Sequence, residues 1–193
     1  VHVIPAYLSP PLDEWRVASL PIGVRTVRDK WDHCIVMSAF HLRSEGGGNI
    51  YGVESVIPLL QSLEKGHLSA GLAVFVAQMG PEVDTLVAEI GALGLSHRFC
   101  LVGDSTPLGP TLTRASLYLR PTRSDGDSVS VREALDSNVP VLASDVCERP
   151  LGVETYAFGK EEELYARVCE LLENREQPSP DVDAGGEAAF QAI

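Results

Sequence analysis

The stretch "RPTRSDGDSVSVREALDSNVPVLASD", residues 120–145, decides the fold. It opens at the end of one short apolar segment and passes through a turn that is rich in acid and glycine. Residues 128–138 then have the spacing of a helix, and residues 139–145 are a buried strand in composition. A strand, a helix and a second strand in succession predict a βαβ crossover with parallel pairing.

The same alternation runs through most of the chain. We expect strands in residues 33–40, 72–80, 97–103, 115–122 and 139–145, and helices in residues 53–65, 81–94, 128–138 and 161–174, with a short turn or helix near 108–114. Pro81 and Gly94 stand where helices begin and end, and Pro58 should lie in the first turns of its helix or bend it. The pattern predicts an α/β protein with a Rossmann-like, doubly wound parallel sheet of about five to six strands.

The two ends of the chain differ from this body. Residues 1–30 contain several prolines among apolar residues, and we expect a linker that leads in from a missing N-terminal domain. Residues 31–174 form the predicted Rossmann-like domain. Residues 175–193 are rich in proline, glycine, alanine and acid, and we expect a flexible tail there.

Composition disfavours several functions. The chain of 193 residues has 15 basic and 27 acidic residues and a net charge of −12, which repels nucleic acid and anionic lipid. Its apolar runs are too short to span a bilayer, and its first residues do not have the pattern of a signal peptide. The four cysteines lack CxxC spacing and no HExxH motif occurs, so we expect reduced thiols in the cytoplasm and no metal site.

A binding site is expected at the carboxyl ends of the strands. In open α/β sheets, ligands bind there, at the point where the strand order reverses. If the order is Rossmann-like, the first and fourth strands are neighbours at that point. The loops of residues 41–52 and 121–128 would then face each other across one crevice.

The second of these loops has groups suited to a sugar nucleotide. Gly126 permits a close approach of the backbone, and Asp127 or Ser128 can cap the following helix. The N–H groups at the start of that helix suit a phosphate. Asp125 and Glu133 are eight residues apart, at most about 12 Å along a helix, which is comparable with the distance from ribose to sugar ring across a diphosphate.

A plainer interpretation also stands at this point. Asp-Gly-Asp-Ser is typical of an ordinary turn that caps a helix. The triple glycine of residues 46–48 fits neither the GxGxxG nor the Walker pattern and is compatible with a simple flexible loop, with Arg43 and His41 as solvated neighbours.

Residues 117–153, "LYLRPTRSDGDSVSVREALDSNVPVLASDVCERPLGV", resemble the C-terminal nucleotide-sugar domain of GT-B retaining glycosyltransferases of the family 4 type. The signature of that family is a carboxylate, seven residues, a glutamate and an alanine, followed by an apolar strand that ends in Ala-Ser-Asp. Asp125, Glu133, Ala134 and residues 139–145 fill these places. The order of elements extends the resemblance over roughly residues 1–174.

The resemblance implies roles for single residues. Glu133 would bind the donor ribose, and Asp125 would contact the donor sugar as the catalytic candidate. The base is expected near residues 101–103. The donor-binding residues implied are Glu133, Gly126, Asp127, Ser128, Val129, Ser130, Arg43, Gly46, Gly47 and Gly48.

The chain departs from the family pattern at several positions. Asp125 is shorter than the commoner glutamate. Ala39 or Phe40 stands where arginine is common, Tyr51 where lysine is common, and Leu151 where an acid is frequent. Arg43, Arg120 or Arg123 would have to replace the absent cations.

By resemblance, the complete protein would transfer a sugar from a nucleotide-diphosphate sugar, such as a UDP- or GDP-sugar, to a hydroxyl acceptor. It would do so with retention, without another cofactor, in polysaccharide or glycoconjugate synthesis. The acceptor would bind to the missing N-terminal domain, and any attachment to the inner face of the membrane would come from the rest of the protein. We expect the isolated domain to be inactive. Two alternatives remain open: a related epimerase of sugar nucleotides, with His41 as its base, and a degenerate interaction domain.

Overall fold

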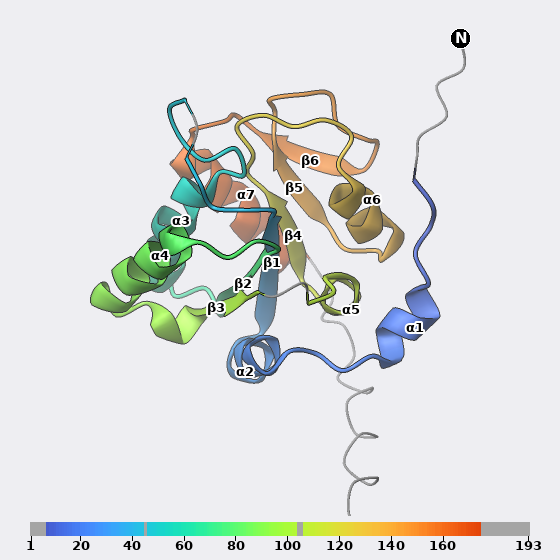
Figure 1. Cartoon of the computed structure of the whole chain (residues 1–193), viewed down its shortest axis with the longest axis horizontal. Helices are drawn as coiled ribbons and strands as arrows, with labels where there is room; N and C mark the ends of the chain where they lie inside the picture. Colours follow the sequence, from blue (N-terminus) through green and yellow to red (C-terminus); the bar gives the residue numbers. More distant parts are fainter. Residues whose placement is uncertain (1–6, 45, 104–105, 175–193) are drawn as a thin grey trace, which may run out of the picture.

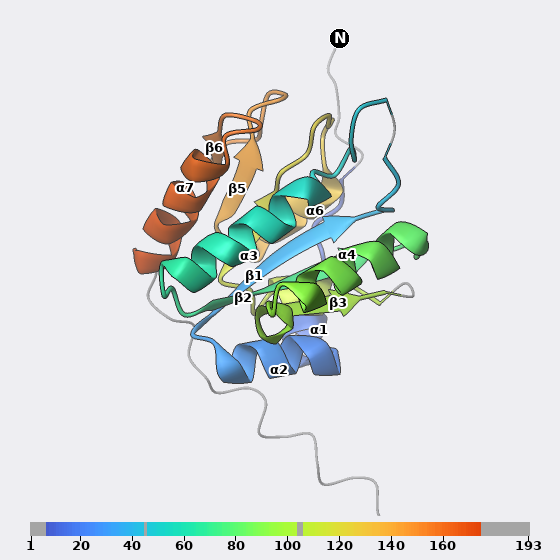
Figure 2. The same ribbon diagram turned by 90° about the vertical axis from the view of Figure 1, so that its left-hand side faces the viewer.

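Six parallel strands form the centre of the molecule, with helices on both faces (Figure 1 and Figure 2). The computed structural model describes residues 7–44, 46–103 and 106–174. The strands follow the order β3-β2-β1-β4-β5-β6, and each neighbouring pair is parallel. This order confirms the predicted Rossmann-like, doubly wound sheet. The strands are β1 (His33–Ala39), β2 (Ala70–Val76), β3 (Phe99–Val102), β4 (Leu117–Arg120), β5 (Val141–Ser144) and β6 (Val153–Tyr156).

The helices form the two outer layers. The helices α3, α4 and α7 cover one face, and α2, α5 and α6 cover the other, with α1 beside α5 (Figure 1 and Figure 2). Their bounds are α1 (Leu12–Val17), α2 (Ile22–Lys30), α3 (Val56–Lys65), α4 (Pro81–Ala92), α5 (Gly109–Leu112), α6 (Val129–Asp136) and α7 (Glu161–Glu173), with 3-10 turns at η1 (Val53–Ser55) and η2 (Ser96–Arg98).

Alternation along the strands builds two separate cores. In β1, Ile35 and Met37 are fully buried under the layer of α3, α4 and α7, whereas Cys34 and Val36 are buried under α2, α5 and α6. Strands that are covered on both faces are apolar at successive positions, which is why the sequence shows short continuous apolar runs instead of an alternating pattern. In the described part of the chain, no helix has the length and apolarity needed to cross a membrane.

Two parts of the fold differ from the sequence expectations in detail. Within the first 30 residues, the structure has the helices α1 and α2, and α2 buries Val24 and Val27 against the sheet. Strand β6 was not expected as a separate element because it is short and carries the exposed Glu154 and Thr155 in its middle. The predicted domain boundaries stay predictions, and the expected flexible tail, residues 175–193, lies outside the described residues.

At Gly52, the loop after β1 packs directly against the loop after β4 at the carboxyl edge of the sheet. Its φ is +69°, and a Cβ at this position would lie 1.7 Å from the carbonyl oxygen of Pro121, which follows β4. The close approach of the two loops therefore depends on the absence of a side chain here.

We expect Gly52→Ala to destabilise the fold more than Gly94→Ala does. Gly94 has a similar φ of +71° but open space around its Cβ position, so its substitution costs only the backbone strain, about 1–2 kcal/mol. The clash with Pro121 should cost about 1–3 kcal/mol more. Urea unfolding of the two variants measures the difference, and equal losses of stability would contradict the close contact.

Candidate functional site

A cavity of about 420 Å³ opens at the carboxyl ends of the strands. It lies where β1 and β4 are neighbours and the strand order reverses, which is the expected position for a ligand in this fold. Four strands and the segments that follow them supply its wall. The lining residues are Ser38, Ala39, Phe40, Tyr51, Phe75, Val76, Ala77, Val102, Thr106, Leu108 and Arg120.

The two loops predicted to face each other are in direct contact beside this cavity. The amide of Arg123 donates a hydrogen bond of 2.8 Å to the carbonyl oxygen of Ile50, and Gly52 packs against Pro121. The loops after β1 and β4 are therefore neighbours, as predicted, but they touch each other instead of facing each other across the cavity, and of the described residues in 41–52 and 121–128 only Tyr51 lines it.

Asn49 fixes the shape of the glycine loop. Its side chain is fully buried, donates to the carbonyl oxygens of His41 (3.3 Å) and Arg43 (3.0 Å), and accepts from the amide of Tyr51 (2.7 Å). Ser44 and Asn49 form an antiparallel bridge, so the loop is a short hairpin. Asparagine in a loop is a weak signal in sequence, and this role of Asn49 was not predicted.

A cation from the loop after β4 lies against the glycine hairpin, and of the three candidates from the sequence it is Arg123. The predicted Arg43 donates to Gln78 (3.1 Å) and lines a separate hollow of about 190 Å³ instead of the main cavity. Arg123 is exposed and lies over the triple glycine: a Cβ at Gly48 would be 2.5 Å from its guanidinium. Gly46, Gly47 and Gly48 all have positive φ angles.

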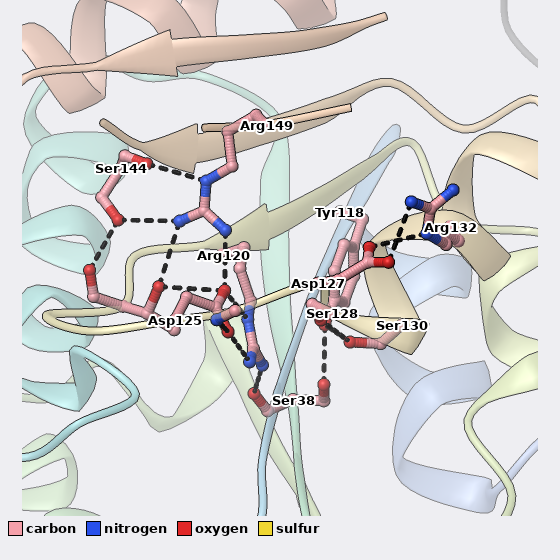
Figure 3. A network of polar contacts seen from close by, with 12 residues as sticks. Ser38, Tyr118, Arg120, Asp125, Asp127, Ser128, Ser130, Arg132, Ser144 and Arg149 are labelled. Atoms are coloured by element: carbon pink, nitrogen blue, oxygen red, sulfur yellow. Dashed lines mark hydrogen bonds and ion pairs between the residues drawn. The ribbon is translucent and has the colours of Figure 1, made fainter. Parts of the chain in front are cut away.

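Asp125 is the centre of a buried ionic network (Figure 3). Arg120 donates to both of its carboxylate oxygens at 2.9 Å, and Arg149 donates to Oδ2 at 2.7 Å. Thr122 adds a hydrogen bond of 3.2 Å. The structure thus places Asp125 next to the cavity wall through Arg120, and its two oxygens accept hydrogen bonds from arginines.

The network controls the ionisation of Asp125. Burial raises the pKa of this carboxyl, but the hydrogen bonds and charges of Arg120 and Arg149 outweigh burial and lower the pKa from 3.8 to about 2. The carboxylate is therefore charged under all ordinary conditions.

The start of α6 keeps its amides free of side-chain caps. Ser128 occupies the N-cap position, but its hydroxyl contacts Ser130 Oγ (3.0 Å) instead of a backbone amide, so the predicted capping hydrogen bond is not made. Asp127 is not the cap either, because it forms an exposed pair with Arg132 (2.6 Å). Val129 is half exposed, and Gly126 has open space around its Cβ position.

A chain of hydroxyls links the cavity to α6 (Figure 3). The hydroxyl of Tyr118, a fully buried residue of β4, lies 2.7 Å from Ser38 Oγ and 2.7 Å from Ser130 Oγ. Ser38 lines the cavity. Tyr118 was not singled out in the sequence, because a tyrosine in a buried strand is indistinguishable there from a core residue.

Glu133 lies on α6 and is half-buried, but it is not among the residues that line the main cavity. Burial raises its pKa. No hydrogen bond or ion pair joins its carboxylate to the described residues, and its charge acts on nearby Tyr7. The ribose contact of Glu133 therefore stays a prediction.

No protein-family model and no curated protein matches the sequence. Solved structures do match. The Anabaena protein HepE, solved in complex with UDP, gives a TM-score of 0.63 at 15% identity over 88% of this chain and 47% of HepE. The lipopolysaccharide glycosyltransferase WaaG gives 0.59 at 19% identity over 86% of this chain and 46% of WaaG.

A third match concerns a domain of similar size. The C-terminal domain of the group 1 glycosyltransferase LpcC from Francisella tularensis gives a TM-score of 0.61 at 13% identity, over 82% of this chain and 86% of that domain. The chain has the Rossmann-like fold of the C-terminal half of a GT-B glycosyltransferase. It spans less than half the length of HepE and of WaaG.

We expect the network around Asp125 to be visible in acid unfolding. Because the pKa is lowered in the folded state, Asp125 contributes stability above pH 3.8, and this contribution is lost as the pH falls towards 2. Asp125→Asn should lower the free energy of unfolding at pH 7 by roughly 3–5 kcal/mol, because it leaves buried arginine charge unpaired. The deficit should shrink between pH 3.8 and 2. A deficit that is independent of pH would contradict the charge pairing, and Asp127→Asn in the exposed pair is the control with little effect.

A second prediction concerns Glu133. Because burial raises its pKa, the folded state favours the neutral form, and the charged form destabilises the protein at pH 7. Glu133→Gln should therefore raise the melting temperature at pH 7 by a small amount, and this gain should vanish in acid, where the glutamate is protonated. A lower melting temperature at pH 7 would show that the carboxylate has a stabilising partner.

Proposed function

We propose that this chain is the donor-binding part of a glycosyltransferase that moves a sugar from a nucleotide-diphosphate sugar to a hydroxyl acceptor. Retention at the anomeric carbon, an acceptor bound by a separate domain, and a role in polysaccharide or glycoconjugate synthesis belong to this proposal. The fold supports it, and so does the UDP present in the HepE structure.

The cavity at the carboxyl ends of strands β1 to β4 carries the proposal. Its volume of about 420 Å³ is within the usual range for small-molecule sites, about 300–1,000 Å³. It combines an apolar end, at Val102 and Leu108, with a polar end at Ser38 and Arg120. A flat base at the first end and a sugar phosphate at the second match this distribution.

The surroundings of the polar end suit a phosphorylated ligand. The first turn of α6, residues 129–132, is joined to Ser38 by the hydroxyl chain and has no side-chain cap. Uncapped helix amides carry partial positive charge and bind phosphates. Glu133 lies one turn further along α6 with no hydrogen-bond or ion-pair partner among the described residues, and we assign to it the ribose hydroxyls.

The epimerase alternative receives less support. It relied on His41 as a base in the crevice. The His41 ring lies between Phe40 and Tyr51, with ring centroids 5.9 and 5.8 Å away, and lines the smaller hollow. His41, the base that this alternative named, therefore does not line the proposed donor site.

Calorimetric titration of the folded domain with UDP and GDP tests the proposal. We expect weak, saturable binding of at least one of them. Glu133→Ala should weaken it about tenfold or more, because a hydrogen-bond acceptor with charge is lost. Glu162→Ala, an exposed position at the start of α7, is the matched control and should leave the affinity unchanged. A folded wild-type domain that binds neither nucleotide would overturn the proposal.

A further inference from the structure

The network around Asp125 contains more positive than negative charge. Two guanidinium groups share one carboxylate, and the side chains of Arg120, Asp125 and Arg149 are only 11%, 7% and 4% exposed. In the described part of the chain, neither arginine forms an ion pair with any other acid. The group therefore holds a net charge of about +1 away from water, which is unfavourable unless an anion or solvent compensates it.

The guanidinium of Arg149 is buried and points at Asp125. Its other hydrogen bonds go to the neutral acceptors Ser144 O (3.0 Å), Ser144 Oγ (3.2 Å) and Thr122 Oγ1 (3.2 Å) (Figure 3). It is absent from the lining of the main cavity. Arg149 thus neutralises the charge of Asp125 without lining the cavity itself.

Arg120 presents the remaining charge to the cavity. Its Nε and Nη2 are held side-on by Asp125, which fixes the plane of the guanidinium. Nη1 makes a long contact of 3.4 Å with the carbonyl oxygen of Ser38, the hydroxyl of Tyr118 lies nearby, and the guanidinium is 5.4 Å from the centre of the Tyr51 ring. Arg120, Ser38 and Tyr51 all line the cavity.

We propose that Arg120 is the residue that contacts the diphosphate, and that Asp125 and Arg149 are positioning residues that act through it. This inference rests on the proposed function and deepens it. The family resemblance implies that the first acid of the signature touches the donor sugar, whereas in this chain the carboxylate orients an arginine. The arrangement also supplies a cation close to Tyr51, where the family commonly has lysine.

The ratio of affinities for a nucleoside and its diphosphate tests this assignment. Titrations with uridine, UMP and UDP, and with the guanosine series in parallel, give the ratio for each variant. In Arg149→Gln, Asp125 has only Arg120 as a charged partner, so the pair is neutral and no positive charge remains for the diphosphate. The ratio of the diphosphate affinity to the nucleoside affinity should therefore fall about 10- to 100-fold. Arg149→Lys retains the charge and should retain most of the gain.

Arg167→Gln is the matched control, because it removes one positive charge from a partly exposed pair between α7 and β6, away from the cavity lining. The ratio is insensitive to partial unfolding, since an unfolded fraction weakens the binding of nucleoside and diphosphate equally. If Arg149→Gln does not fold, Arg120→Gln provides the same comparison and should also lose the diphosphate gain.

Each outcome separates the two proposals. A wild-type domain that binds no nucleotide overturns the proposed function, and failure to bind inorganic pyrophosphate then overturns the charge assignment as well. If the protein binds nucleotides normally, and the ratio of diphosphate to nucleoside affinity is the same in wild type and in Arg149→Gln, only the present inference is overturned. Equal losses for uridine and UDP, in both the Gln and the Lys variant, would show that Arg149 merely supports the fold.

Discussion

The parallel pairing of β1 with β4 determines the geometry of everything around the candidate site. Ile35 lies opposite Leu117 and Met37 opposite Leu119, so both strands deliver their following loops to the same edge of the sheet. The glycine hairpin and the acidic turn then meet, with Gly52 against Pro121 and Arg123 bound to Ile50. A cavity forms here because the connections after β1 and β4 pass to opposite faces of the sheet, which leaves space between them at its edge.

Charge at this edge is organised by one aspartate. The buried carboxylate of Asp125 fixes the loop after β4 to the segment after β5, because it pairs with Arg120 at the end of β4 and with Arg149 beyond β5. The same contacts leave Arg120 at the cavity wall. Stability and the electrostatic character of the site are therefore coupled, and substitutions at Asp125 affect both.

Much of the fold was predictable because the sheet is buried on both faces. The five apolar runs located five strands, and Pro81 and Gly94 bounded a helix. Strand β6 and the helices α1 and α2 escaped prediction, since they are short or only partly covered. For the site, the meeting of the two loops followed from strand order alone. The partners of Asp125 did not, because Arg149 is 24 residues away and nothing in its local sequence indicates a buried charge.

The central claim is that a nucleotide diphosphate occupies the cavity at the carboxyl ends of strands β1 to β4. The most direct test is to map amide chemical-shift changes by NMR during titration of the labelled domain with UDP or GDP. We expect saturable shifts at Ser38, at Val102 and in the first turn of α6, with those of Gly80 and Glu82 in the smaller hollow unchanged. Shifts confined to the smaller hollow beside Arg43, or none in a folded sample, would contradict the account.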